Sequence, residues 1–242
     1  MPIKRFAKRS LRALGYVLVR LEPGSHFPTS RQTLFETLGI SLVLDVGANT
    51  GQFAEQIRNF GYKDRILSFE PLSSAYEALQ DSARADVLWE TFNYALGNKD
   101  TRALIYISSN SYSSSLLRML PSHVRSAPES AYIGQEEVAI KSLDSVCDAL
   151  LLRQNGVYLK IDAQGYENEV LNGAARALEH IDTIQLEMSV KPLYEGALLF
   201  DAMHERLSGM KYRLVGLEPG FTDNDTGELL QFDGIYHRYT TE

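Results

Sequence analysis

The alternation of short apolar runs with helical patterns, which begins at Ser41, constrains the fold more than any other feature of the sequence. Buried strands are predicted for "SLVLDV", "RILSFE" and "VLWETFNYAL", because each is a short apolar run bounded by polar or turn residues. Helices are predicted between them for "GQFAEQIRNFG" and "PLSSAYEALQDSARA". A β-α-β-α-β succession of this kind predicts a parallel sheet with right-handed crossovers.

The middle of the chain is less regular, after which the sheet resumes at "VYLKID" and then reverses its direction. Further strands are predicted for "RALIYIS", "EEVAIKSL", "VYLKID" and "IDTIQLEM", and a helix for "YENEVLNGAARALEH". Near the end, "YRLVGLE" and "GIYHRYT" flank the turn-rich segment "EPGFTDNDTGE", which predicts an antiparallel hairpin. We therefore predict an α/β fold with a doubly wound, mostly parallel seven-stranded sheet of the Rossmann-like methyltransferase type and a C-terminal antiparallel hairpin.

The first thirty residues carry a different pattern from the remainder. Over residues 3–21 apolar residues recur at three- and four-residue steps, and basic residues occupy most of the opposite face: Lys4, Arg5, Lys8, Arg9 and Arg12. This pattern is typical of a helix that contacts an anionic membrane surface, and also of an appendage that packs its apolar face on the main domain. We predict a basic amphipathic helix and linker over residues 1–30, followed by one methyltransferase-type domain over residues 31–242.

The composition limits the compartments and partners that this chain can have. Its 242 residues carry a net charge of −7, and an acidic body argues against a nucleic-acid partner. Its single cysteine, Cys147, excludes an internal disulfide and a cysteine-based metal site. No apolar run is as long as a membrane span. We therefore expect a cytoplasmic protein, in contact with the inner face of the membrane if its N-terminal helix binds lipid.

The stretch "LVLDVGANTG" carries the first strand into a turn that contains Gly47, Ala48, Asn49 and Gly51. Ligands of open α/β sheets bind at such strand-to-helix turns. Glycines let the chain turn tightly and let a ligand approach the backbone, and the following helix offers unpaired amide groups. A dinucleotide fingerprint reads G-x-G-x-x-G, but the position after Ala48 is Asn49. The turn therefore favours a nucleotide ligand other than NAD.

Three polar residues at strand ends complete the predicted cofactor site. Asp45 would repel a pyrophosphate and attract an ammonium group, and Glu70 can accept hydrogen bonds from both ribose hydroxyls. Asn93 ends the third strand, where it can hydrogen-bond to adenine. A ligand with an ammonium group and a ribose but no phosphate is S-adenosylmethionine. Each of the three residues also has a structural interpretation, as a capping acid of a loop or helix or as an ordinary turn residue.

Several motifs are similar to those of a known family and occur in that family's order. They are "LDVGANTGQFA", "SFEP", "NYALGN", "SLD", "LKIDAQGYENEVLNGA", "IQLEMS" and "FDGIYHR". Over residues 41–238 the chain resembles the FkbM-type S-adenosylmethionine-dependent methyltransferases. The resemblance implies an O-methyltransferase that acts on a hydroxyl of a small molecule, above all a sugar moiety of a glycolipid, polysaccharide or secondary metabolite.

Methyl transfer to a hydroxyl requires a group that removes the hydroxyl proton. Asp162 ends the predicted strand "VYLKID" and is the first candidate for this general base, and Glu187 near the end of "IDTIQLE" is the second. Asp162 could instead cap the helix that comes after it. Lys160 lies in the same strand, where an unpaired ammonium would be costly. We predict that it either pairs with a carboxylate or takes part in catalysis.

A metal site and a substrate-binding loop are also compatible with the sequence. Asp162, Glu167 and Glu187 could together hold Mg²⁺, with water completing the coordination, although surface acids are commoner than metal ligands. The serine-rich loop over residues 108–115 could contact a polyol or close over the site, although loops of this kind are usually solvated. An alternative to an enzyme is a non-catalytic module that keeps the methyltransferase fold and docks to a membrane or partner through its basic helix.

Overall fold

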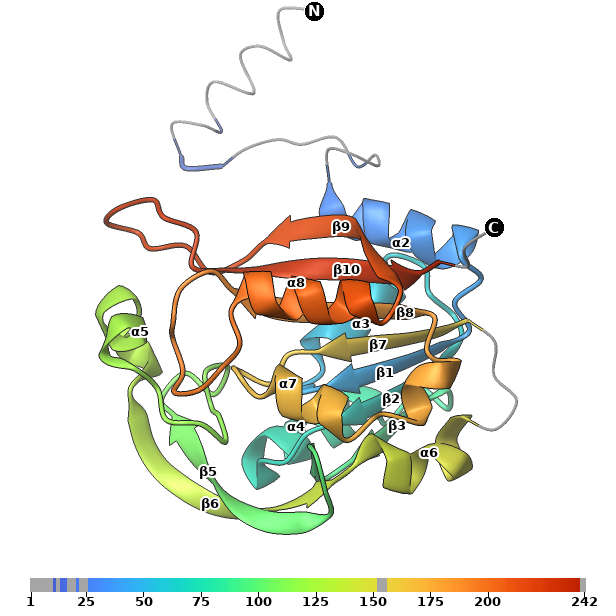
Figure 1. Cartoon of the computed structure of the whole chain (residues 1–242), viewed down its shortest axis with the longest axis horizontal. Coiled ribbons are helices and arrows are strands. Elements are labelled where there is room, and N and C mark those ends of the chain that lie inside the picture. Colours follow the sequence, from blue (N-terminus) through green and yellow to red (C-terminus); the bar gives the residue numbers. More distant parts are fainter. Residues whose placement is uncertain (1–10, 12–13, 17–20, 22–25, 152–155, 240–242) are drawn as a thin grey trace, which may run out of the picture.

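A seven-stranded sheet forms the centre of the structure, a computed structural model that describes residues 11, 14–16, 21, 26–151 and 156–239 (Figure 1). The strand order is β3-β2-β1-β7-β8-β10-β9. The strands are β1 (Leu42–Val46), β2 (Arg65–Phe69), β3 (Trp89–Phe92), β7 (Val157–Ile161), β8 (Thr183–Ser189), β9 (Tyr212–Pro219) and β10 (Gln231–Arg238). The five adjacent strands from β3 to β8 in this order run parallel to one another, whereas β10 runs antiparallel to both β8 and β9. The predicted fold class is therefore confirmed.

Two layers of helices cover the sheet. One layer contains α2 (Phe27–Thr37), α3 (Gln52–Asn59) and α4 (Ser73–Ala83), and the other contains α6 (Leu143–Leu151), α7 (Glu167–Asn172) and α8 (Phe200–Gly209). Successive side chains of a strand face opposite sides. Leu44 of β1 accordingly packs in the cluster that contains Val170 of α7. Its neighbour Val43 packs on the other side, with Phe35 of α2 and Ile57 of α3.

Helix α2 belongs to one of these layers, although the sequence suggests a linker at its start. Pro28 occupies the first turn, where its missing N–H would have no helical partner in any case. Phe35 is buried against the rings of Tyr62 and Tyr158. The boundary predicted between residues 30 and 31 lies inside this helix.

The predicted basic helix over residues 3–21 falls almost wholly outside the described residues. In the part of the chain that the structure describes, every helix is too short or too polar to span a bilayer. The first helix or strand that lies wholly within the described residues is α2.

The middle of the chain forms a second, smaller sheet. β5 (Thr101–Ser108) and β6 (Tyr132–Lys141) pair antiparallel, and the short β4 (Ala95–Leu96) pairs with β6. Figure 1 shows β5 and β6 as a curved two-stranded arm beside the main sheet. Between them lie α5 (Pro121–Ser126) and the 3₁₀ helix η1 (Pro128–Ser130), which the sequence patterns did not predict. The arm brings the serine-rich loop to the turn after β1, where Asn49 donates a hydrogen bond to Ser111.

The helix predicted for residues 166–180 is divided in the structure. α7 ends at Asn172, and the 3₁₀ helix η2 covers Ala177–His180. The division begins at Gly173, which packs on the backbone of Gly97. A Cβ atom at Gly173 would lie 1.9 Å from the carbonyl oxygen of Gly97. The α7 end can therefore approach the turn between β4 and β5 only because the residue at this contact has no side chain.

Replacing Gly173 by Ala should destabilise the protein. The added methyl group must displace the backbone of Gly97, and overpacking of this kind typically costs about 1–3 kcal/mol. Gly209→Ala is the matched control, because a Cβ atom there would meet no atom within 4 Å and alanine favours a helix. Thermal unfolding should show a lower Tm for Gly173→Ala and an unchanged or higher Tm for Gly209→Ala. Equal Tm values in the two variants would contradict this packing.

Candidate functional site

A cavity of about 400 Å³ opens at the carboxyl ends of the central strands, a size typical of small-molecule sites. Its wall contains the turns after β1, β2 and β7, the serine-rich loop, and residues of α2, α3, β8, β9 and β10. The sequence-predicted residues that line it are Gly47, Ala48, Asn49, Glu70, Lys160, Asp162 and Glu187. The predicted residues that do not line it are Asp45, Gly51, Asn93 and Glu167.

The turn after β1 is held by close backbone contacts. Gly47 has φ +75°, and a Cβ atom there would lie 1.9 Å from the carbonyl oxygen of Asp162. The amide of Gly47 donates to the carbonyl of Phe69 at the end of β2. Gly51 has φ +99°, and a Cβ atom there would lie 2.8 Å from the ring of Trp89. The absence of a side chain at Gly47 therefore lets the turn pack on the end of β7. The absence of one at Gly51 lets the start of α3 pack on the Trp89 ring.

Glu70 follows β2 and has its carboxylate in the cavity wall. One oxygen accepts a hydrogen bond from the amide of Asn49 at 2.9 Å, and the other accepts one from the amide of Leu72 at 2.8 Å. Burial raises the pKa of Glu70 to about 7, and these two amides act in the opposite direction. Each carboxylate oxygen has a second lone pair. Glu70 can therefore bind the hydroxyls of a ribose while it holds the two loops together.

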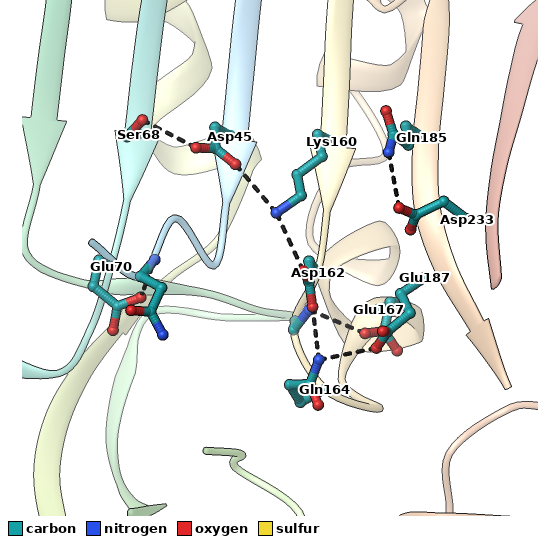
Figure 2. A network of polar contacts seen from close by, with 12 residues as sticks. Asp45, Ser68, Glu70, Lys160, Asp162, Gln164, Glu167, Gln185, Glu187 and Asp233 are labelled. Atoms are coloured by element: carbon teal, nitrogen blue, oxygen red, sulfur yellow. Dashed lines mark hydrogen bonds and ion pairs between the residues drawn. The ribbon is translucent and has the colours of Figure 1, made fainter. Parts of the chain in front are cut away.

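Asp45 has a different environment from the one its place in the sequence suggests (Figure 2). It is completely buried, lies 3.3 Å from the ammonium of Lys160 and accepts a hydrogen bond from the Ser68 hydroxyl at 3.2 Å. These residues are register partners on neighbouring strands, so their side chains face the same side of the sheet. The ammonium group expected beside Asp45 is thus supplied by the chain's own lysine and not by a ligand.

Asn49 provides an unpaired acceptor in the same turn. Its backbone has φ +49°, and its side-chain amide donates to the hydroxyl of Ser111 at 3.2 Å. The side-chain oxygen is buried and has no hydrogen-bond partner among the described residues. A buried oxygen without a donor is unfavourable unless water or a ligand supplies one. Asn49 therefore suits a ligand that carries an ammonium or another N–H group.

A continuous row of polar side chains lies at the ends of β7 and β8 (Figure 2). The ammonium of Lys160 lies 3.4 Å from one oxygen of Asp162, and the side-chain amide of Gln164 donates to the other oxygen at 2.8 Å. The same amide donates to Glu187 at 2.9 Å. The side chain of Asp162 is 35% exposed and that of Lys160 is 8% exposed. In this row the carboxylate of Asp162, and not the ammonium, is accessible to a ligand.

Lys160 remains a cation in this environment. Burial opposes its charge, but the combined attraction of Asp162, Asp45 and Asp233 outweighs burial and raises the pKa of Lys160. An ammonium that keeps its proton cannot act as a general base. The sequence leaves two interpretations of Lys160 open, an ion pair or a part in catalysis. The structure shows the ion pair.

Glu187 and Asp233 are carboxyls whose raised pKa favours the protonated form. Burial, together with the charges of Asp162 and Asp233, raises the pKa of Glu187 well above its ordinary value. Burial, followed by the charge of Asp162, also raises the pKa of Asp233, which accepts a hydrogen bond from Gln185 at 3.1 Å. Protonated carboxyls can donate as well as accept hydrogen bonds. This part of the cavity can therefore bind uncharged polar groups.

The structure gives no support to a metal site formed by Asp162, Glu167 and Glu187. The carboxylate of Glu167 lies outside the cavity wall and accepts hydrogen bonds from the amides of Ala163 at 3.0 Å and Gly165 at 3.1 Å. Across the described ranges, no three or more His, Cys, Asp or Glu side chains are grouped so that they could hold a metal ion. Glu167 instead stabilises the loop that leads from β7 into α7.

Asn93 supports the turn after β2 and does not face the cavity. Its side-chain amide donates to the carbonyls of Glu70 at 3.0 Å and Pro71 at 3.1 Å. The next strand, β4, does reach the cavity, because Ala95 and Leu96 are part of its wall. Asn93 therefore holds the backbone of Glu70 in place, and the amide predicted to bind adenine is used for these two hydrogen bonds.

The serine-rich loop forms part of the cavity wall through specific hydrogen bonds. Ser111 accepts a hydrogen bond from Asn49, and the hydroxyl of Ser115 donates to the backbone carbonyl of Gln164 at 2.7 Å. Ser111 has φ +58°, a conformation that is uncommon for serine and is maintained by its surroundings. The loop therefore joins the turn after β1 to the turn after β7.

Another part of the wall comes from residues that the sequence patterns do not single out. They are Arg31, Gln52, Phe53, Gln56, Gln185, Glu218 and Asp233. Arg31 is 2% exposed, lies 3.7 Å from Glu218 and faces the ring of Phe53 at 4.8 Å. Gln185 lies within the motif "IQLEMS" and Asp233 within "FDGIYHR", but neither motif marks the residue as part of a site. For Arg31 there is no signal, because α2 begins in a segment rich in proline and glycine.

Comparison with known proteins identifies the family. The family model of the methyltransferase FkbM domain matches residues 45–214, which is more than half of the chain. The chain belongs to the FkbM methyltransferase family. This family depends on S-adenosylmethionine, which is thus the cofactor implied for the cavity. The unpaired oxygen of Asn49 and the carboxylate of Glu70 are acceptors suited to its ammonium group and ribose.

Solved structures share the fold at low sequence identity. The FkbM methyltransferase from Methylobacillus flagellatus KT is 17% identical, with a TM-score of 0.50, and the match covers 81% of this chain and 43% of that protein. The present chain thus spans less than half the length of that relative. Such a likeness concerns the fold alone.

Two further structures are more distant. A putative RNA methyltransferase from Pyrococcus horikoshii is 11% identical, with a TM-score of 0.46, over 88% of this chain and 85% of that protein. Fibrillarin from Aeropyrum pernix, with natively bound S-adenosyl-L-methionine, is 10% identical, with a TM-score of 0.46, over 81% of this chain and 66% of that protein. No curated protein matches the sequence of this FkbM-family chain.

Removing Lys160 alone should destabilise the protein more than removing the whole ion pair. In Lys160→Met the carboxylate of Asp45 would be buried without a cation, and breaking a buried pair in this way costs about 3–5 kcal/mol. The double variant Lys160→Met with Asp45→Asn removes both charges of this pair and should recover much of the stability. Urea unfolding of the single and double variants measures the difference. A double variant no more stable than Lys160→Met would contradict the coupling of the two residues.

Proposed function

We propose that this protein is an S-adenosylmethionine-dependent O-methyltransferase that methylates a hydroxyl of a small molecule, in particular a glycosyl hydroxyl. The observation that carries this proposal is the position of Asp162, an accessible carboxylate held by Lys160 and Gln164. It lies in the wall of the same cavity as Glu70. One cavity therefore offers both an acceptor for the ribose of a methyl donor and a base for the hydroxyl of a methyl acceptor.

The residues suited to the donor are those of the turns after β1 and β2. Glu70 would accept hydrogen bonds from ribose hydroxyls, and the unpaired oxygen of Asn49 would accept one from the ammonium group. S-Adenosylmethionine, when bound, supplies a methyl group on a positively charged sulfur. The backbone of Gly47 and Ala48 lines the cavity without a bulky side chain, so a ligand can approach it closely.

Asp162 is the proposed general base. Lys160 and Gln164 each occupy one of its oxygens, and each oxygen keeps a second lone pair. A free lone pair can accept the proton that the acceptor hydroxyl loses during transfer. Because both oxygens are held, the carboxylate keeps one orientation in the cavity, and a fixed orientation of the reacting groups accelerates transfer. Glu187, whose pKa burial raises well above its ordinary value, would orient the acceptor by hydrogen bonding.

The remaining wall supports an acceptor rich in hydroxyl groups. Gln56, Gln185 and Asp233 provide amide and carboxyl groups that can donate or accept hydrogen bonds, and Phe53 provides an apolar ring. Such a combination suits a sugar, which has hydroxyls at its edges and C–H groups on its faces. The number of carboxyls in this wall disfavours an acceptor that carries phosphate or sulfate.

Calorimetric titration with S-adenosylhomocysteine tests the donor site. We expect saturable binding of this nucleoside and none of NAD. Because burial raises the pKa of Glu70 to about 7, its carboxylate gains a proton as the pH falls through that value and becomes a poorer acceptor. Affinity should fall about tenfold from pH 8 to pH 6, in proportion to the ionised fraction. In Glu70→Gln it should be weak and nearly independent of pH.

The outcomes of this titration differ clearly. A folded protein that fails to bind S-adenosylhomocysteine would contradict the proposed enzyme and favour a non-catalytic docking module. Binding with the same pH dependence in Glu70→Gln would keep the enzyme but remove Glu70 from the donor site.

Asp162→Asn should retain S-adenosylhomocysteine binding and lose most of the turnover, because an amide cannot accept the hydroxyl proton. Loss of a general base typically lowers the rate about 10²- to 10⁴-fold. Turnover can be followed as release of S-adenosylhomocysteine from the methyl donor, with a panel of methyl glycosides as acceptors and with amines and carboxylic acids of similar size for comparison. Asp201→Asn, at an exposed position of α8, is the control. Undiminished turnover in Asp162→Asn, or turnover with amines alone, would contradict the assignment.

A further inference from the structure

Gln164 lies where the carboxylates of the cavity, the serine-rich loop and Tyr194 meet. Its side-chain nitrogen donates to Asp162 at 2.8 Å and to Glu187 at 2.9 Å. Its side-chain oxygen accepts a hydrogen bond from the hydroxyl of Tyr194 at 2.6 Å. An amide group has two N–H hydrogens, so both are used, and the bond from Tyr194 prevents the amide from turning over.

The backbone of Gln164 is held as firmly as its side chain. It has φ +51°, a left-handed conformation that is uncommon for residues other than glycine and persists only where the surroundings impose it. Its carbonyl accepts a hydrogen bond from Ser115 at 2.7 Å. The next residue, Gly165, has φ +95°, and a Cβ atom there would lie 2.8 Å from the Cβ of Tyr194. The strained turn thus fits against Tyr194 on one side and the serine-rich loop on the other.

We propose that Gln164 is a positioning residue for methyl transfer: its amide separates Asp162 from Glu187 and orients both. The inference rests on the proposed role of Asp162 as general base. Two neighbouring carboxyls without a spacer share a proton, as like charges at short range disfavour double ionisation. A base that already holds a shared proton cannot take one from the acceptor. By donating to both groups, Gln164 keeps Asp162 available and leaves the proton on Glu187.

Other contacts show that the effect of Gln164 falls mainly on Asp162. Glu187 has a second amide donor, because Gln231 donates to the same oxygen at 2.7 Å. Asp162 receives the Gln164 amide on one oxygen, and Lys160 lies beside the other oxygen. Without the Gln164 amide, Glu187 would still be held by Gln231 of β10. Asp162 would then be free to rotate towards Glu187.

Two variants test this role, one at the nitrogen of the Gln164 amide and one at the partner of its oxygen. Gln164→Glu keeps the shape of the side chain but removes both donors, and Tyr194→Phe keeps the ring but releases the amide oxygen. With the methyl glycoside that turns over in the acceptor panel, we expect kcat to fall about tenfold to a hundredfold in Gln164→Glu, and less in Tyr194→Phe, since hydrogen bonds to charged groups are lost. KM for the donor and the affinity for S-adenosylhomocysteine should change less than about twofold. Gln80→Glu, at an exposed position of α4, is the matched control and should leave kcat unchanged.

An NMR measurement tests the bridge without any acceptor. In ¹⁵N-labelled protein the Gln164 side-chain amide signals are identified by their loss in Gln164→Glu. These signals should shift strongly in Asp162→Asn and in Tyr194→Phe, and stay in place in Gln80→Glu. Amide signals that do not respond to Asp162→Asn would overturn the bridge. Unchanged kcat in Gln164→Glu, in a protein whose wild type turns over, would overturn the positioning role alone, whereas a wild type that fails to bind S-adenosylhomocysteine would contradict the proposed function and not the bridge.

Discussion

The ammonium of Lys160 is the interaction on which the rest of the site depends. A lysine in a strand covered on both faces can remain charged only beside carboxylates that compensate it. The register of β1 with β7 places Asp45 beside it, and Asp162 follows where β7 ends. The same cation thus fixes the pairing of two central strands and the orientation of a carboxylate in the cavity. A change at Lys160 would therefore alter both the strand pairing and the orientation of Asp162.

The sequence predicted those parts of the fold and site that depend on local pattern. The strand-helix alternation indicated the parallel sheet and its terminal hairpin, and residues at strand ends or in the first turn, such as Gly47, Glu70 and Asp162, line the cavity as expected. The partner of Asp45 could not be predicted, because it depends on the pairing of strands far apart in the chain. The start of helix α2 could not be predicted, because Pro28 is as typical of a loop as of the first turn of a helix.

The contacts of the serine-rich loop could not be predicted, for a different reason. Polar composition is typical of a solvated loop, but the hydroxyls of Ser111 and Ser115 bond to Asn49 and Gln164 in two separate turns of the main sheet. Which hydroxyl meets which partner depends on where the curved arm of β5 and β6 carries the loop, and that is a property of tertiary structure. The loop thus joins the turn after β1 to the turn after β7 in a single cavity wall.

Trp89, the only tryptophan of the chain, lies beside both Ser68 and Gly51. Its indole N–H donates to the hydroxyl of Ser68 at 2.9 Å, and that hydroxyl in turn donates to Asp45. Its ring occupies the space next to Gly51, at the start of α3, the helix that follows the turn after β1. The emission of an indole depends on the local electric field and on its solvation. The intrinsic fluorescence of the native chain should therefore respond, without any label, to the charge of the buried pair of Asp45 and Lys160. It should also respond to movement of the turn after β1.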